Sequence, residues 1–121
     1  MVTYDQFAGR CEAVLGRIRQ ACAAAGRATD SVRLLPVTKT HPVEAAIFAH
    51  RFGLPAVGEN RVQEAAGKWP MFRERYDGIE VHLIGPLQTN KARQAMDLAQ
   101  AIHSVDRPKL AETLARLAQE R

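Results

Sequence analysis

Lys39 is the residue whose type and position best suit covalent chemistry. It follows the apolar run Arg33–Val37, in the segment RLLPVTK. At the end of a buried strand, desolvation disfavours the ammonium form and lowers the pKa of a lysine. A neutral amine is the form that makes a Schiff base with an aldehyde. The alternative is a lysine that extends from a strand end into solvent. The other three lysines fall on predicted helices.

Three further apolar runs carry polar residues at or near their ends. In parallel α/β folds, ligands bind at the carboxyl ends of the strands, because the loops that follow the strands converge there. The sequence therefore predicts a single site built from four strand ends. Its polar segments are Thr38–Thr40, Gly58–Asn60, His82 with Gly85–Asn90, and His103–Asp106.

Each of these residues also has a purely structural interpretation. Asn60 either caps the following helix or contacts a ligand from the cap position. His82 is either an ordinary part-buried histidine or a ring that lies against a planar cofactor or hydrogen-bonds to it. Glu59 is predicted to form an ion pair or a hydrogen bond inside the rim. Gly58 and Gly85 allow a close backbone approach.

No metal site is predicted. His82 and His103 both fall in the predicted site, but a zinc centre needs further ligands at suitable spacing. The patterns HxH, HExxH and CxxC are absent from the sequence.

An amphipathic helix is predicted over residues 4–25. Thr3 and Gln6 have the spacing of a capping box, and Gly26 is suited to end the helix. Apolar residues recur every three or four positions along this segment and form one stripe. The two cysteines, Cys11 and Cys22, lie roughly 16 Å apart on such a helix. They cannot form a disulfide with each other, and we expect two buried thiols.

The remaining chain alternates short apolar runs with helical stretches, about 20–26 residues per unit, which indicates βα repeats and a parallel sheet. Four such strands leave an open sheet rather than a closed eight-stranded barrel. We therefore expect half of a larger fold, or a homodimer that covers the open edge. The predicted strands are 33–37, 56–58, 79–84 and 101–105. The predicted helices are 42–53, 61–76 with a break at Pro70, 89–99 capped by Thr89 or Asn90, and 107–119 capped by Asp106.

Composition indicates an ordinary globular domain spanning residues 1–121. Of the 121 residues, 46% are hydrophobic and 25% charged, with a formal net charge of +4. The basic residues are dispersed, which does not indicate a nucleic-acid-binding surface. The N-terminal residues contain no apolar signal core, and no run reaches membrane-spanning length, so we expect a cytoplasmic protein without a membrane anchor.

Four segments resemble, in order, the N-terminal signature blocks of the YggS/PROSC family. They are LLPVTKTHPVEAA, VGENRVQEA, VHLIGPLQTNKAR and IHSVDR. The resemblance implies a TIM barrel like the N-terminal domain of alanine racemase. It also implies a carrier of pyridoxal 5′-phosphate (PLP) in vitamin B6 and amino-acid homeostasis, without established catalysis. It assigns Lys39 as the Schiff-base lysine, and it assigns Asn60, His82 and Ser104 as residues that line the cofactor pocket.

The sequence also departs from this family. Arg61 stands where many members have an aromatic residue, and members are roughly twice as long. The resemblance places the phosphate-binding loops in their second half, so we expect weakened PLP binding, with PLP-dependent apoenzymes as candidate recipients. Two other functions remain open: a racemase-like PLP enzyme, and a non-catalytic interaction module. A fragment that does not fold stably is the third alternative.

Overall fold

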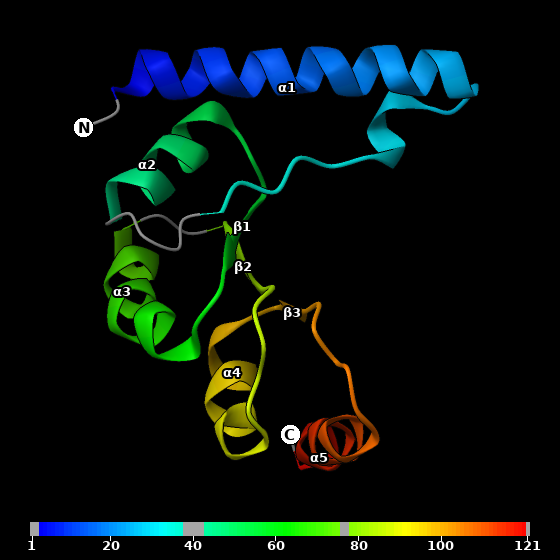
Figure 1. Cartoon of the computed structure of the whole chain (residues 1–121). Helices are drawn as coiled ribbons and strands as arrows, with labels where there is room; N and C mark the ends of the chain where they lie inside the picture. Colours follow the sequence, from blue (N-terminus) through cyan, green and yellow to red (C-terminus); the bar gives the residue numbers. More distant parts are fainter. Residues whose placement is uncertain (1–2, 38–42, 76–77, 121) are drawn as a thin grey trace.

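The computed structural model describes residues 3–37, 43–75 and 78–120 as helices packed around a small parallel sheet (Figure 1). The elements alternate as βα repeats predict. In chain order they are α1 (Tyr4–Ala25), the 3₁₀ turn η1 (Thr29–Ser31), α2 (Val43–Phe52), β1 (Ala56–Glu59), α3 (Val62–Arg75), β2 (Glu80–Leu83), the 3₁₀ turn η2 (Thr89–Lys91), α4 (Ala92–Leu98), β3 (Ala101–Ile102) and α5 (Pro108–Gln119).

The sheet has three parallel strands in the order β1-β2-β3. Gly58 pairs with His82, and His82 pairs in turn with Ala101. Sequential parallel strands side by side are the arrangement that successive βα units produce. The strands are short, and their order in the sheet follows their order in the sequence.

The strand predicted over residues 33–37 is present only as an isolated parallel bridge between Val37 and Gly58. A hydrogen bond from the Gly58 amide to the Pro36 carbonyl, 2.7 Å long, accompanies it. Pro36 has no N–H to donate, which removes one bond from any ladder at this position. The sheet of the described residues therefore has three strands, where the sequence predicted four.

One face of the sheet packs against helices. Val57 and Val81 are fully buried in a cluster with side chains of α2, α3 and α4, including Trp69. Leu83 belongs to a second cluster with Leu110 and Leu117 of α5. In Figure 1, α2, α3 and α4 follow one another around this side of the strands, while no described helix covers the opposite side.

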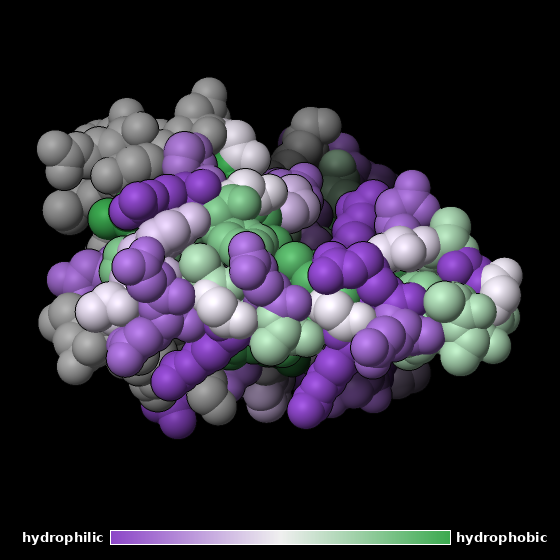
Figure 2. All heavy atoms as spheres, turned by 90° about the horizontal axis from the view of Figure 1, so that it is seen from above, coloured by the Kyte–Doolittle hydropathy of each residue, from purple (hydrophilic) through white to green (hydrophobic). Residues whose placement is uncertain are grey.

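Helix α1 has the predicted bounds. The hydroxyl of Thr3 accepts from the Gln6 amide, the Gln6 side chain accepts from the Thr3 amide, and Gly26 ends the helix at φ 70°. Cys11 and Cys22 are buried free thiols, as predicted. Figure 2 shows the face of the molecule that carries α1, and hydrophilic residues predominate there.

Predicted details of helices α3 and α4 are wrong. Helix α3 continues through Pro70, and we attribute this to the neighbouring Trp69, which is fully buried in the core. Neither Thr89 nor Asn90 caps α4, which follows η2 without a side-chain cap. The Thr89 hydroxyl instead accepts from Arg107, 3.4 Å away.

The start of α5 also differs from the prediction. Arg107, rather than Asp106, occupies the cap position, and no side-chain cap bond is made there. The Asp106 carboxylate instead accepts from Nη1 of Arg107 at 2.7 Å. Pro108 lies in the first turn, as predicted. Within the described ranges, no helix has the length and apolar character needed to cross a bilayer.

Candidate functional site

The three strands end at one edge of the sheet, and hydrogen bonds extend the ladder beyond them. The Ile84 amide donates to the Glu59 carbonyl, and the His103 amide donates to the Leu83 carbonyl, each at 2.9 Å. The segments that follow β1, β2 and β3 therefore leave the sheet side by side. This is the edge at which the sequence predicted a site.

Gly85 and Asn60 are in close backbone contact at this edge. A Cβ on Gly85 would overlap the Asn60 carbonyl oxygen and lie 2.8 Å from its carbonyl carbon. Only glycine allows this approach, as predicted for Gly85. The expectation for Gly58 is wrong, because a Cβ there would meet Leu35 and Ile84 side-chain atoms at 3.4 Å, which is ordinary contact.

Ser104 fixes the same turn from the side of β3. Its hydroxyl donates a short hydrogen bond to the Gly85 carbonyl. Nη2 of Arg107 donates to the Leu87 carbonyl at 2.6 Å. The loop after β2 is therefore tied to the segment after β3 at two points, while Gly85 packs against Asn60 after β1.

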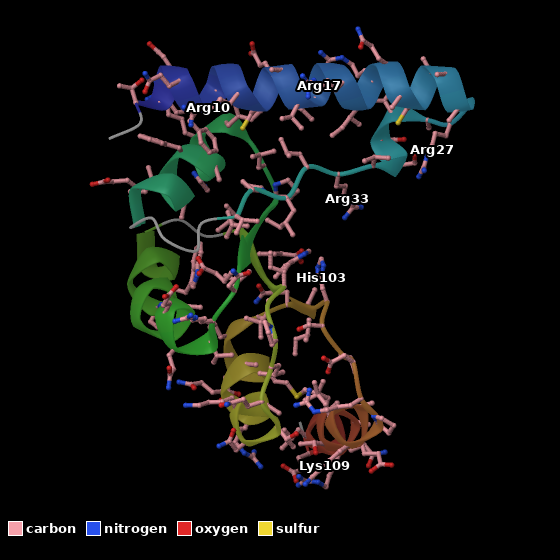
Figure 3. All side chains as sticks on the ribbon, in the orientation of Figure 1. Arg10, Arg17, Arg27, Arg33, His103 and Lys109 are labelled. Atoms are coloured by element: carbon pink, nitrogen blue, oxygen red, sulfur yellow. The ribbon has the colours of Figure 1, made fainter. Side chains whose placement is uncertain are left out.

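His82 lies on β2. Asn60 and Ser104 contact Gly85, whereas the His82 side chain contacts His103 and Glu80. Its Nδ1 lies 3.1 Å from Nε2 of His103, and its Nε2 lies 3.2 Å from Oε1 of Glu80. The two imidazole rings are 5.2 Å apart and tilted by 52°. Figure 3 shows the His103 side chain on the side of the strands away from α3 and α4.

Glu80, which contacts His82, was not among the residues predicted for the site. Residues two apart on a strand point to the same face, so the spacing from Glu80 to His82 was an available signal. The pair of hydrogen bonds at His82 requires a defined arrangement of imidazole protons, since each N–H can donate only once.

Two further predicted residues are Glu59, which the structure describes, and Lys39, which it does not. Glu59 is fully buried at the end of β1, with no exposed surface. Lys39 lies outside the described residues, two positions beyond Val37. The described part of the chain therefore contains three of the four predicted cofactor-binding residues: Asn60, His82 and Ser104.

An open pocket of about 510 Å³ lies beside Asn60. It separates the start of α3 from the loop after β2, and its wall contains two basic and three amide side chains. Its volume falls within the usual range of small-molecule sites. The lining residues are Asn60, Arg61, Val62, Gln63, Pro86, Leu87, Gln88 and Lys91.

Metal-binding geometry is not found in the described ranges, where no three His, Cys, Asp or Glu side chains come together. The edge instead offers hydrogen-bonding groups and an aromatic ring. An α/β protein of successive βα units, with polar groups at the carboxyl edge of a parallel sheet, is the class that this geometry defines.

Comparison with known proteins identifies the family. No family model matches the chain. Curated relatives named pyridoxal phosphate homeostasis protein do match: the one from Pseudomonas aeruginosa is 46% identical over 101 residues, 84% of this chain and 43% of the relative. The one from Vibrio alginolyticus is 43% identical over 105 residues, 85% of this chain and 45% of the relative. The chain belongs to the YggS/PROSC family of pyridoxal phosphate homeostasis proteins.

Solved structures agree with the sequence relatives. A protein of unknown function from Bifidobacterium adolescentis superposes with a TM-score of 0.88 at 33% identity, covering 100% of this chain and 54% of that one. PipY of Synechococcus elongatus, solved with PLP bound, has a TM-score of 0.72 at 40% identity, covering 85% and 48%. The chain spans about half the length of the relatives that it matches.

Proposed function

We propose that residues 1–121 form the N-terminal part of a (βα) barrel of the TIM type and bind PLP as a Schiff base on Lys39. The role is that of a carrier in vitamin B6 and amino-acid homeostasis rather than a catalyst. Supporting this, PipY, with 40% identity, was solved with PLP bound, and the curated relatives carry the name of a homeostasis protein.

The observation that carries the proposal is the convergence of three strand ends on Gly85. Asn60 packs against it and Ser104 donates to its carbonyl. Val37, two residues before Lys39, pairs with Gly58 in the same sheet. We infer that Lys39, which follows this bridge in the sequence, reaches the edge where Asn60 and Ser104 each contact Gly85.

The three described residues suit different contacts with a planar, polar cofactor. Among the described residues the Asn60 side chain has no hydrogen-bond partner, so its amide is available to a ligand. The Ser104 hydroxyl already donates to Gly85 and retains only acceptor capacity. Both ring nitrogens of His82 are engaged, so His82 contributes its ring face. PLP, when bound, supplies an aldehyde that an amine can attack.

PLP-dependent apoenzymes are the proposed recipients of the cofactor, and the proposed compartment is the cytoplasm. A homodimer would cover the open edge of the sheet. Sedimentation at several protein concentrations tests the dimer, and a single monomeric species throughout would refute it.

Titration with PLP followed by borohydride reduction and peptide mapping tests the function. We expect Schiff-base absorbance and one reduced adduct on Lys39. Lys39→Ala removes the signal, whereas Lys109→Ala, an exposed lysine on α5, retains it. Adducts spread equally over all four lysines, or none, would refute a specific site. Exchange of an amino-acid α-proton for solvent deuterium would contradict the carrier role.

A further inference from the structure

The pocket beside Asn60 is cationic. Arg61 and Lys91 both line it, and none of the described residues that line it carries a negative charge. Neither basic side chain forms an ion pair with any carboxylate in the described part of the chain. This differs from Arg93, Arg107 and Arg116, which all have acidic partners.

The amide side chains of the pocket, like its two basic side chains, are available to bind a ligand. Those of Asn60, Gln63 and Gln88 make no hydrogen bond to another described residue. The apolar side chains of Val62 and Leu87 are buried beneath them. Five hydrogen-bond-donating side chains, two of them charged, therefore surround one cavity of about 510 Å³.

The backbone of this cavity is fixed on two sides. Gly85 packs against the Asn60 backbone, and the Leu87 carbonyl accepts from Arg107 at 2.6 Å. The two walls are thus held at a defined separation without any bond across the cavity. A preformed wall lowers the entropic cost of binding a ligand.

We infer that this pocket is a binding site for a phosphate group carried on a small organic molecule. Phosphate oxygens accept charge-assisted hydrogen bonds from guanidinium and ammonium groups, and the planar guanidinium can donate two in parallel. The amides supply further donors, and the cavity has room for the organic part of a phosphate ester. The residues assigned to this site do not include Lys39.

The test uses the 121-residue chain with inorganic phosphate and phenyl phosphate as probes, at constant ionic strength because salt screens exposed charges. We expect saturable shifts of the Gln63, Gln88 and Lys91 backbone amides in ¹H–¹⁵N spectra. Arg61→Gln or Lys91→Gln weakens binding about tenfold, the loss expected from one charge-assisted bond. Lys39→Ala leaves phosphate binding unchanged, which separates this site from the Schiff-base lysine.

Two matched controls remove the same charges elsewhere. Arg17 on α1 and Lys109 on α5 are exposed and lie outside the pocket (Figure 3). Arg17→Gln and Lys109→Gln should leave the affinity within about twofold, because the charge they remove is not at the site. Equal weakening by pocket and control variants, or the absence of saturable shifts at the pocket amides, would overturn the inference.

A comparison of PLP with pyridoxal distinguishes two sources of the phosphate. If Lys91→Gln weakens binding of PLP but not of pyridoxal, the pocket holds the phosphate of the cofactor itself. If it affects neither aldehyde while still weakening phenyl phosphate, the pocket serves a separate phosphate ester. Both results support a phosphate site.

Discussion

Nδ1 of His82 lies 3.1 Å from Nε2 of His103, so a side chain of β2 is hydrogen-bonded to one that follows β3. Glu80, two residues before His82 on β2, engages the other nitrogen of the same ring at 3.2 Å. The His82 ring is thereby fixed in orientation on the face of the sheet that no described helix covers. A fixed ring face is suited to lie against a planar ligand.

Replacement of His103 tests this arrangement. His103→Ala leaves Nδ1 of His82 without its partner while Glu80 still engages Nε2, so we expect the His82 Nδ1 signal to move in long-range ¹H–¹⁵N correlation spectra. The free energy of unfolding should fall by less than about 1 kcal/mol, because His103 is exposed. His50→Ala, on α2, should leave both His82 signals in place. An unchanged Nδ1 signal in folded His103→Ala would show that the two rings are not bonded in solution.

Gly85→Ala should destabilise the edge of the sheet. The added methyl overlaps backbone atoms of Asn60, which cannot move without displacing the end of β1. We expect a loss of about 1–3 kcal/mol in the free energy of unfolding, measured by urea denaturation. PLP affinity should fall with it, because Asn60 moves.

Gly67→Ala is the matched control for that substitution. Gly67 lies on α3, where an added Cβ would meet no atom within 4 Å. Alanine in a helix interior is favoured over glycine by about 1 kcal/mol, so this variant should be as stable as the parent or more so. If Gly85→Ala behaved in the same way, the close approach to Asn60 would be absent in solution.

Helix ends that are set by residues within one turn were predictable from the sequence. Helix α1 has its predicted bounds because Thr3, Gln6 and Gly26 act within one turn of its ends. The predicted caps of α4 and α5 failed for a different reason. Thr89 bonds to Arg107, 18 residues away, and Asp106 bonds to the same arginine. The contact with Thr89 depends on the fold and leaves no local pattern, whereas the contact with Asp106 joins neighbours in the sequence and competes with the predicted cap.

The candidate site shows the same division. The positions of Asn60, His82 and Ser104 at or near strand ends were predictable from the alternation of strands and helices. Their role toward PLP was implied by the family resemblance and stays a prediction. The pocket between Arg61 and Lys91 was not found, since 30 positions separate these residues in the sequence and only the fold brings them to opposite walls of one cavity. The strand at residues 33–37 was overestimated, because Pro36 lies within an otherwise apolar run.

Ser104→Ala should lower stability by removing one bond. The hydroxyl donates to the carbonyl of Gly85, which is buried, so the carbonyl loses its partner and gains little water. We expect a loss of about 1 kcal/mol in urea denaturation. Ser31→Ala removes a similar bond to the Ala28 carbonyl in an exposed turn, where water replaces it, and should cost less than about 0.5 kcal/mol. Equal losses would mean that the Gly85 carbonyl is solvated.

Stability should fall at alkaline pH, in part because of Cys11. Cys11 is 6% exposed, and burial raises the pKa of its thiol by desolvating the thiolate. The folded chain therefore holds this proton more tightly than the unfolded chain does. Its contribution is fully present below the unfolded pKa of about 8.5 and is lost as the pH rises through the higher folded value.

The slope of unfolding free energy against pH isolates this effect. Cys11→Ala and Cys11→Ser both remove the titrating thiol but differ in polarity. Each therefore shifts the free energy of unfolding by a different amount that does not depend on pH. Both should show the same shallower decline than the parent between about pH 8 and pH 10, since every other titratable group is common to all three proteins. A parent curve parallel to both variants would mean that the Cys11 thiol titrates equally in the folded and unfolded chain, and that its burial does not shield it from water.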